Sequence, residues 1–170
     1  MVLRSRHVCG KCGVENDFLY GTALNYDVSR VFRIPEGWGT PQYARRDSDE
    51  AMRLLVLDDR VAEATYDALA ECDELPLKFF YKHDDFICSD CGLTQSHFFF
   101  FLRKRGGTAF TPSYGCRGCG GRMRLAEACV RQFGEQEKKF RCVGCGSVSP
   151  MGDPDDYEIL DYRITECLKL

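Results

Sequence analysis

Four copies of one cysteine motif are the residues of this chain with the clearest chemistry. Two cysteines three positions apart can place both sulfurs on one metal ion, because the tight turn between them directs backbone N–H groups toward the thiolates. A glycine after the second cysteine allows the positive φ that ends such a turn. The four copies are CGKCG (9–13), CSDCG (88–92), CRGCG (116–120) and CVGCG (142–146).

Four half-sites supply the ligands of two tetrahedral metal sites. We predict two structural Zn²⁺ ions, because an all-cysteine site is coordinatively closed and leaves no position for a substrate. Iron uses the same four-thiolate geometry, and the sequence does not distinguish the two metals. A redox Cys-x-x-Cys would instead stand once, at the start of a helix. The expected ligands are Cys9, Cys12, Cys88, Cys91, Cys116, Cys119, Cys142 and Cys145.

The pairing of the four motifs has three solutions. Sequential pairing joins 9–12 with 88–91 and 116–119 with 142–145, and it is favoured because only 22 residues separate the last two motifs. Nested pairing joins 88–91 with 116–119, across 24 residues, and the two outer motifs with each other. A cross-braced arrangement, as in RING-type folds, is the third solution. The eight ligands are the same in each case.

The segment between the last two motifs has the character of a β-hairpin. It reads CRGCGGRMRLAEACV, then a polar turn region, then KKFRCVGCG, with Met123 and Leu125 as strand residues. This segment resembles a zinc ribbon, a short three-stranded module of transcription and translation proteins. The resemblance rests on the motif and implies β-hairpins organised by zinc, with a binding rather than a catalytic role.

A long segment separates the first two motifs, and its 75 residues are too many for a structureless loop. Strand-like residues occupy 19–26, 31–34 and 77–81. A helical pattern begins at Asp47, which has capping-box spacing to Glu50, whereas residues 52–57 fit either a helix or a strand. An apolar stripe at helical spacing then consists of Val61, Ala64, Thr65, Ala68, Leu69 and Cys72.

These segments predict an α+β fold in which zinc-ribbon-like β-hairpins carry an α+β insertion. The expected parts are a first knuckle (1–18), the insertion (19–82), a zinc-ribbon region with a basic face (83–149) and an acidic C-terminal segment (150–170). The cysteines left over are Cys72, Cys129 and Cys167, and we expect the first two to be buried as small apolar side chains.

Charge is divided unevenly along the chain. Residues 92–149 carry 10 Lys/Arg against 3 Asp/Glu, or +7, whereas residues 1–91 carry −6 and residues 150–170 carry −4. Cations on rigid hairpins suit phosphate contacts, and aromatic residues among 98–101, Phe110 and Tyr114 suit stacking on bases. Alternatively, the cations neutralise the chain's own acidic segments. The candidate binding residues are Arg103, Lys104, Arg105, Arg117, Arg122, Arg124, Lys138, Lys139 and Arg141.

One stretch, HFFFFLRKRGG (97–107), combines an apolar run with a cationic end. It is too short and too quickly charged to span a membrane. In a strand, Phe98 and Phe100 would face one side and Phe99 and Phe101 the other. We predict a β-hairpin whose cationic turn at 103–107 is a contact surface and whose return strand is 108–110.

Two functions from different classes fit these features. The first is a noncatalytic zinc-ribbon protein that engages nucleic acid, or the transcription or translation machinery, through the basic face of residues 92–149. The second is a zinc-stabilised adaptor or inhibitor that binds a single protein partner and no nucleic acid. Because no catalytic motif and no secretory signal is apparent, we expect no enzyme and an intracellular protein, cytoplasmic or nuclear, without a membrane partner.

Overall fold

The computed structural model describes residues 2–21, 56–72, 81–128 and 137–152, together with the backbone of 157–160. The strand expected at 31–34, residues 77–80 of the strand expected at 77–81, the capping residues Asp47 and Glu50, and Cys129 and Cys167 lie outside these ranges. The chain divides into two compact units. Unit 1 comprises Met1–Gly21, His83–His97 and Ser113–Leu160, and unit 2 comprises Thr22–Lys82, Phe98–Pro112 and Asp161–Leu170.

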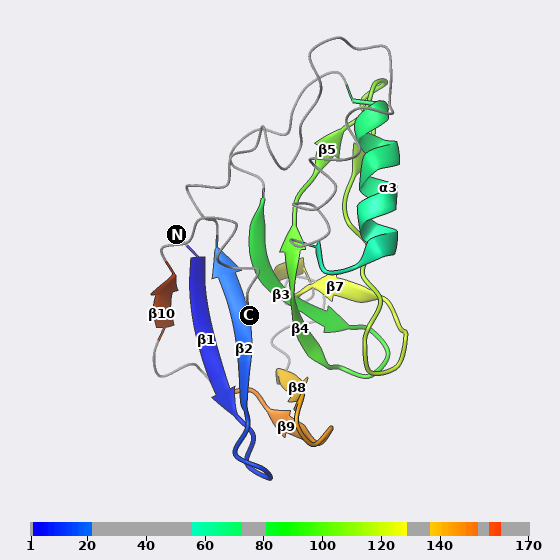
Figure 1. Ribbon diagram of the computed structural model, residues 1–170. Coiled ribbons are helices and arrows are strands. Elements are labelled where there is room, and N and C mark those ends of the chain that lie inside the picture. Colours follow the sequence, from blue (N-terminus) through cyan, green and yellow to red (C-terminus); the bar gives the residue numbers. More distant parts are fainter. Residues whose placement is uncertain (1, 22–55, 73–80, 129–136, 153–156, 161–170) are drawn as a thin grey trace. The chain divides into compact units, whose positions relative to one another are not determined.

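Antiparallel pairing dominates the described residues. The largest sheet has the order β10-β1-β2-β3-β4, and β7 pairs with β3 away from this path (Figure 1). Its strands are β10 (Tyr157–Leu160), β1 (Val2–Val8), β2 (Glu15–Gly21), β3 (Lys82–Cys88), β4 (Thr94–Phe99) and β7 (Met123–Leu125). Together with the helix of unit 2, these sheets agree with an α+β class.

The β1–β2 hairpin is the longest regular pairing in unit 1. It runs from Val2 opposite Gly21 to Val8 opposite Glu15, and the first cysteine motif forms its turn. A shorter hairpin of β8 (Lys139–Arg141) and β9 (Val148–Pro150) carries the last motif at its turn. Each of these two motifs therefore lies at the tip of a hairpin, where strand pairing holds both of its ends.

Two small cores support these hairpins. Phe18 of β2 and Phe140 of β8 pack edge to face at 6.1 Å, in one buried cluster with Cys9 and Cys142. The second core is aromatic: His97 stacks on Tyr114 at 4.1 Å, and Phe86 meets Tyr114 edge-on. Both cores lie directly beside cysteine motifs, so the four-cysteine groups and the apolar packing reinforce each other.

Unit 2 contains helix α3 (Asp59–Ala70). The Asp58 side chain accepts hydrogen bonds from the N–H groups of Arg60 and Val61, which caps the first turn. The predicted stripe is confirmed at four positions, which are Val61, Thr65, Ala68 and Cys72. It is wrong at Ala64, which is exposed, because the buried arc centred on Thr65 extends toward Ala62 instead. No described helix is long and apolar enough to cross a membrane.

The phenylalanine stretch forms the predicted hairpin. Phe98 and Phe100 are fully buried, whereas Phe99 and Phe101 are half-buried, as the alternation requires. The strands β5 (Leu102–Arg103) and β6 (Ala109–Phe110) pair across a turn in which Gly106 and Gly107 have φ values of 83° and 84°. Glycine is required there because other residues rarely adopt such angles.

The cationic turn of this hairpin lies against the C-terminal end of α3. The Arg105 N–H donates to the Glu71 carbonyl at 2.9 Å, and the Lys104 ammonium pairs with the Glu71 carboxylate at 2.9 Å. The last carbonyl groups of a helix lack partners within it and carry the negative end of its dipole. Lys104 and Arg105 therefore complete the helix terminus, and Arg103 is exposed.

Candidate metal centres

The four cysteine motifs adopt one backbone conformation. In each, the N–H of the first cysteine donates to the carbonyl five residues later, and the N–H of the following glycine donates back to the first cysteine's carbonyl. The N···O distances of these eight bonds lie between 2.7 and 3.0 Å. The glycines have positive φ, at Gly13 (73°), Gly92 (70°), Gly120 (78°) and Gly146 (70°). The predicted turn is confirmed in all four copies.

The motifs pair in the nested order. The first centre consists of Cys9, Cys12, Cys142 and Cys145, and the second centre consists of Cys88, Cys91, Cys116 and Cys119. The sequential pairing that we favoured is wrong. It rested on a short connection, but loop length changes the closure entropy only slowly, whereas the Phe18–Phe140 contact and the β3–β7 pairing bring the nested partners together.

The sulfur geometry of both centres suits one four-coordinate metal ion. All four ligand atoms of each group lie within 4.8 Å of one another. Sulfur pairs across the first centre are 3.7 Å (Cys9–Cys145) and 3.5 Å (Cys12–Cys142) apart. A tetrahedral site with Zn–S bonds of about 2.3 Å has sulfur–sulfur edges of about 3.8 Å, whereas a disulfide requires about 2.05 Å. Both groups could therefore hold metal ions, and neither is disulfide-bonded.

Backbone N–H groups at the turns favour thiolates. The Gly144 N–H approaches the Cys142 sulfur at 3.3 Å, an arrangement repeated in the second centre. The hydrogen bond with the Ser147 hydroxyl has the largest effect on Cys9, and the N–H groups of Cys12 and Lys11 add to it. Together they lower the pKa of Cys9 to about 5. Burial opposes ionisation of Cys88, but turn N–H groups outweigh it and lower the pKa of that thiol to about 7. Burial and the neighbouring sulfurs instead raise the pKa of Cys91 to about 12, because several thiolates repel one another without a cation. Thiolates are the form that binds a metal ion.

Complementary side chains match the two members of each centre. Val14, directly after the first motif, packs so closely over Gly144 that a methyl group there would lie 2.8 Å from a Val14 methyl carbon. Leu93, at the equivalent position after the second motif, covers Gly118 in the same way, at 2.5 Å. The sequence therefore contained a signal against sequential pairing, and nested and cross-braced pairing share it. Two motifs have the form Cys-x-Gly-Cys, and each lies against a motif that lacks this glycine.

A second correspondence follows two residues further on. The Asn16 side-chain oxygen accepts a hydrogen bond from the Val143 N–H at 2.9 Å, and the Gln95 oxygen accepts one from the Arg117 N–H at 3.4 Å. In both centres the donor follows the first cysteine of the partner motif. Each centre is therefore the same assembly of one long and one short hairpin. Sequence reasoning did not identify these amides as supports of the metal sites.

Within unit 1 the strand β8 lies beside both centres. The backbone of Lys139 in β8 bridges that of Leu93 beside the second centre. The Lys138 ammonium pairs with the Asp85 carboxylate at 2.7 Å, and Asp85 is almost completely buried. Arg141 extends over Gly118, with its Nε 3.4 Å from the position of an added methyl group, and donates to the Gly146 carbonyl at 3.0 Å. The β8–β9 hairpin thus contacts both centres.

The predicted binding cations differ in their surroundings. Lys104 and Lys138 are partly buried and have carboxylate partners, and Lys139 forms an exposed ion pair with Glu137 at 3.2 Å. Arg117, Arg122 and Arg124 are exposed in unit 1 and lie in or beside the third motif. The exposed members of the predicted set are Arg103, Arg105, Arg117, Arg122, Arg124, Lys139 and Arg141.

The aromatic residues considered for base stacking are mostly unavailable. Phe98 and Phe100 are fully buried, and Tyr114 is 1% exposed beneath His97. The stacking role is therefore wrong for these three, because the apolar interior of each unit uses them. Phe99, Phe101 and Phe110 are half-buried. Any stacking contact would therefore have to use these three residues.

Comparisons with protein-family models, with curated proteins and with solved structures found no match.

Proposed function

We propose that this chain is a noncatalytic protein in which two structural Zn²⁺ ions support an arginine surface that contacts the phosphates of nucleic acid. The observation that carries this proposal is the position of Arg117, Arg122 and Arg124. All three are exposed, and all three lie in or beside the third cysteine motif. We call them the arginine surface.

We propose zinc as the metal of both sites. Thiolate ligands select soft or borderline ions such as zinc or iron over magnesium or calcium. The sulfur–sulfur distances of 3.4 to 3.7 Å agree with a tetrahedral site, and four protein ligands close the coordination shell. Zinc has no redox chemistry and would act here by holding pairs of hairpins together.

The backbone beneath the arginine surface is held at several points. The Arg117 N–H donates to Gln95, and the Arg122 carbonyl accepts from the Ser89 N–H at 3.1 Å. Arg124 is paired with Ile87 across β7 and β3. Arg122 and Arg124 are two residues apart on an extended segment, so their side chains project from the same side. Such a surface presents cations to phosphates with little loss of backbone entropy.

The charges of the metal centres are too small to account for all of these cations. One Zn²⁺ with four thiolates carries −2, so the two centres together carry −4. Residues 92–149 have a net charge of +7 before the thiolates are counted. Even if the whole −4 is assigned to this region, +3 remains. Neutralisation of the centres therefore leaves cationic character for a polyanionic partner.

The proposal is tested by the binding of a labelled single-stranded oligonucleotide, measured by fluorescence anisotropy at several salt concentrations. Each phosphate contact on a single strand contributes about 0.7 to the salt slope, so Arg117→Ala/Arg122→Ala/Arg124→Ala should weaken binding and reduce the slope by roughly 2. Arg60→Ala, which removes an exposed cation of α3, is the control and should bind normally. No binding at low salt, or equal loss in both variants, would refute the proposal.

The metal part has its own measurement. Native mass spectrometry of freshly purified protein should find two zinc ions per chain, and chelation should unfold the protein cooperatively. Folded protein without metal, or protein with bound iron, would contradict this part. A stoichiometric protein partner seen in the same spectrum, with no oligonucleotide binding, would favour the adaptor function.

A further inference from the structure

The outer face of the β8–β9 hairpin combines apolar and cationic side chains. Lys139 lies opposite Pro150 and Arg141 lies opposite Val148, and these four side chains are exposed. Phe140, between them on β8, points the other way into the core. The strand register therefore places Lys139, Arg141, Val148 and Pro150 on the outer face of the hairpin. On this face two cations lie beside two apolar side chains.

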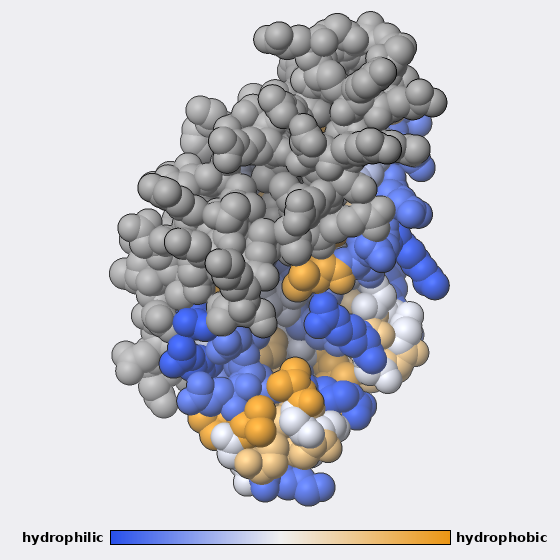
Figure 2. All heavy atoms as spheres, in the orientation of Figure 1, coloured by the Kyte–Doolittle hydropathy of each residue, from blue (hydrophilic) through white to orange (hydrophobic). Residues whose placement is uncertain are grey.

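Three exposed valines lie in, beside or against the last cysteine motif and its hairpin. Val143, at the tip of the last motif, is 82% exposed, and Val148 is 50% exposed. Val14 is 37% exposed and lies against Gly144, next to Val143 in the chain. We call these residues the valine surface. Hydrophobic residues gather among hydrophilic ones at the end of unit 1 where the β1–β2 and β8–β9 tips lie (Figure 2).

The rigidity of this surface favours a binding role. Val143 follows a metal ligand, and its N–H is bound by Asn16. Val148 follows Ser147, whose hydroxyl contacts the sulfurs of Cys9 and Cys145. A side chain on a backbone held in this way loses little entropy when a partner covers it. Exposed apolar side chains that cluster on such a backbone are typical of contact sites.

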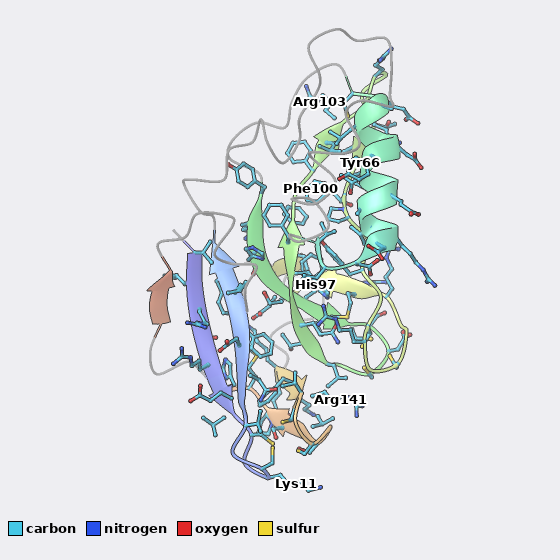
Figure 3. The ribbon with its side chains drawn as sticks, viewed as in Figure 1. Lys11, Tyr66, His97, Phe100, Arg103 and Arg141 are labelled. Atoms are coloured by element: carbon cyan, nitrogen blue, oxygen red, sulfur yellow. The ribbon has the colours of Figure 1, made fainter. Side chains whose placement is uncertain are left out.

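We propose that the valine surface binds an acidic segment of a partner protein that inserts an aliphatic or aromatic anchor residue. Lys139 lies on the same face and would pair with the partner's carboxylates, as would the exposed part of Arg141, whose guanidinium also donates to the Gly146 carbonyl. Lys11, at the tip of the β1–β2 hairpin, adds a third exposed cation at this end of unit 1 (Figure 3). The existing Lys139–Glu137 ion pair is exposed, and exposed ion pairs contribute little stability. It would therefore not prevent Lys139 from pairing with a carboxylate of the partner.

Other occupants fit this surface less well. A nucleic-acid backbone would use the cations but would leave the valines without an apolar contact. A second copy of the chain would place Lys139 and Arg141 against the same cations in a two-fold interface. Addition of a strand to β9 is disfavoured, because this strand has three residues and ends at Pro150. An acidic peptide with an apolar anchor satisfies both features of the surface.

The test uses short random peptides displayed on phage and selected on the zinc-loaded full chain. We expect selected peptides to combine Asp or Glu with Leu, Ile or Phe. Their affinity should fall about tenfold in Val143→Ser/Val148→Thr, since each lost apolar contact is worth up to roughly tenfold. Because both valines are exposed, the variant should keep its metal content and melting temperature. Val8→Ser is the matched control, because Val8 is 61% exposed but follows His7, whose ring faces Phe140 on the opposite side of β1.

The outcomes separate this inference from the proposed function. Selection of no peptides, selection of peptides without acidic residues, or equal affinity for the wild type and the valine variant would overturn it. Oligonucleotide binding should be unchanged in the valine variant, whereas peptide binding should survive the loss of Arg117, Arg122 and Arg124. If one variant abolished both activities, a single shared surface would replace the two proposed here.

Discussion

Gly118 offers the most direct test of how the two halves of a metal centre fit together. A methyl group at this position would lie 2.5 Å from Cδ1 of Leu93 and 3.4 Å from Nε of Arg141. Carbon atoms in good contact are separated by about 3.5–4.0 Å, so Leu93 would have to move by about 1 Å. Leu93 is only 3% exposed and has little room to do so. Gly118→Ala should therefore cost about 1–3 kcal/mol, as overpacked cores do.

The assay is thermal and denaturant unfolding of the freshly purified protein. For a chain of this size the expected cost lowers the melting temperature by roughly 2–12 °C. Gly10→Ala is the matched control, because Gly10 also lies between two metal ligands but has nothing within 4 Å of an added methyl group and has no positive φ. It should leave the melting temperature unchanged within about 1 °C.

A double variant identifies the cause. Leu93→Ala alone should cost about 2–5 kcal/mol because it leaves a cavity. In Gly118→Ala/Leu93→Ala the new methyl group occupies part of that cavity, so the combined cost should be smaller than the sum by about 1 kcal/mol or more. Additive costs, or equal stability of Gly118→Ala and Gly10→Ala, would show that Leu93 does not cover Gly118 and would refute the nested pairing.

Three further predictions concern stability. Burial lowers the pKa of His83 to about 4, below its unfolded value of 6.5. Folding stability should therefore be intact above pH 6.5 and fall by about 3 kcal/mol as the pH drops to 4. This part of the loss should be absent in His83→Gln, measured by denaturant unfolding across that pH range. Lys138→Met leaves the buried Asp85 carboxylate without its cation and should lower the unfolding free energy by about 1–3 kcal/mol. This is less than the cost for a fully buried pair, because Lys138 is partly exposed. Lys139→Met removes only an exposed pair and should change the unfolding free energy by less than about 0.5 kcal/mol, so equal costs would contradict this reasoning. Asp58→Ala removes the cap of α3 and should reduce stability by about 0.5–2 kcal/mol, measured by the same denaturant titration; no change would show that the cap does not stabilise the helix.

The cysteine motifs show how far local sequence could determine the metal sites. Each motif contains both ligands, the turn and the glycine within five residues, so its conformation depends on interactions that the segment makes with itself. The four positive-φ glycines and the inward-facing thiols therefore follow from the motif alone. The alternation of Phe98 to Phe101 was predictable for a similar reason, because an extended backbone turns successive side chains to opposite sides.

Tertiary packing decided what local sequence left open. The partner of each motif depends on contacts between distant residues, such as Val14 with Gly144 and Leu93 with Gly118, and on the core that joins Phe18 to Phe140. Loop length had suggested another pairing, but its entropic effect is small compared with the burial of these side chains.

The same distinction applies to the residues expected to bind a partner. Composition showed a basic region but could not show which cations the fold itself uses. Lys104 and Arg105 complete the end of α3, and Lys138 neutralises Asp85. A charge pattern alone therefore determined the sign of the surface. Only tertiary structure determined which charges remain exposed, because that depends on which buried carboxylates and helix carbonyls lie within reach.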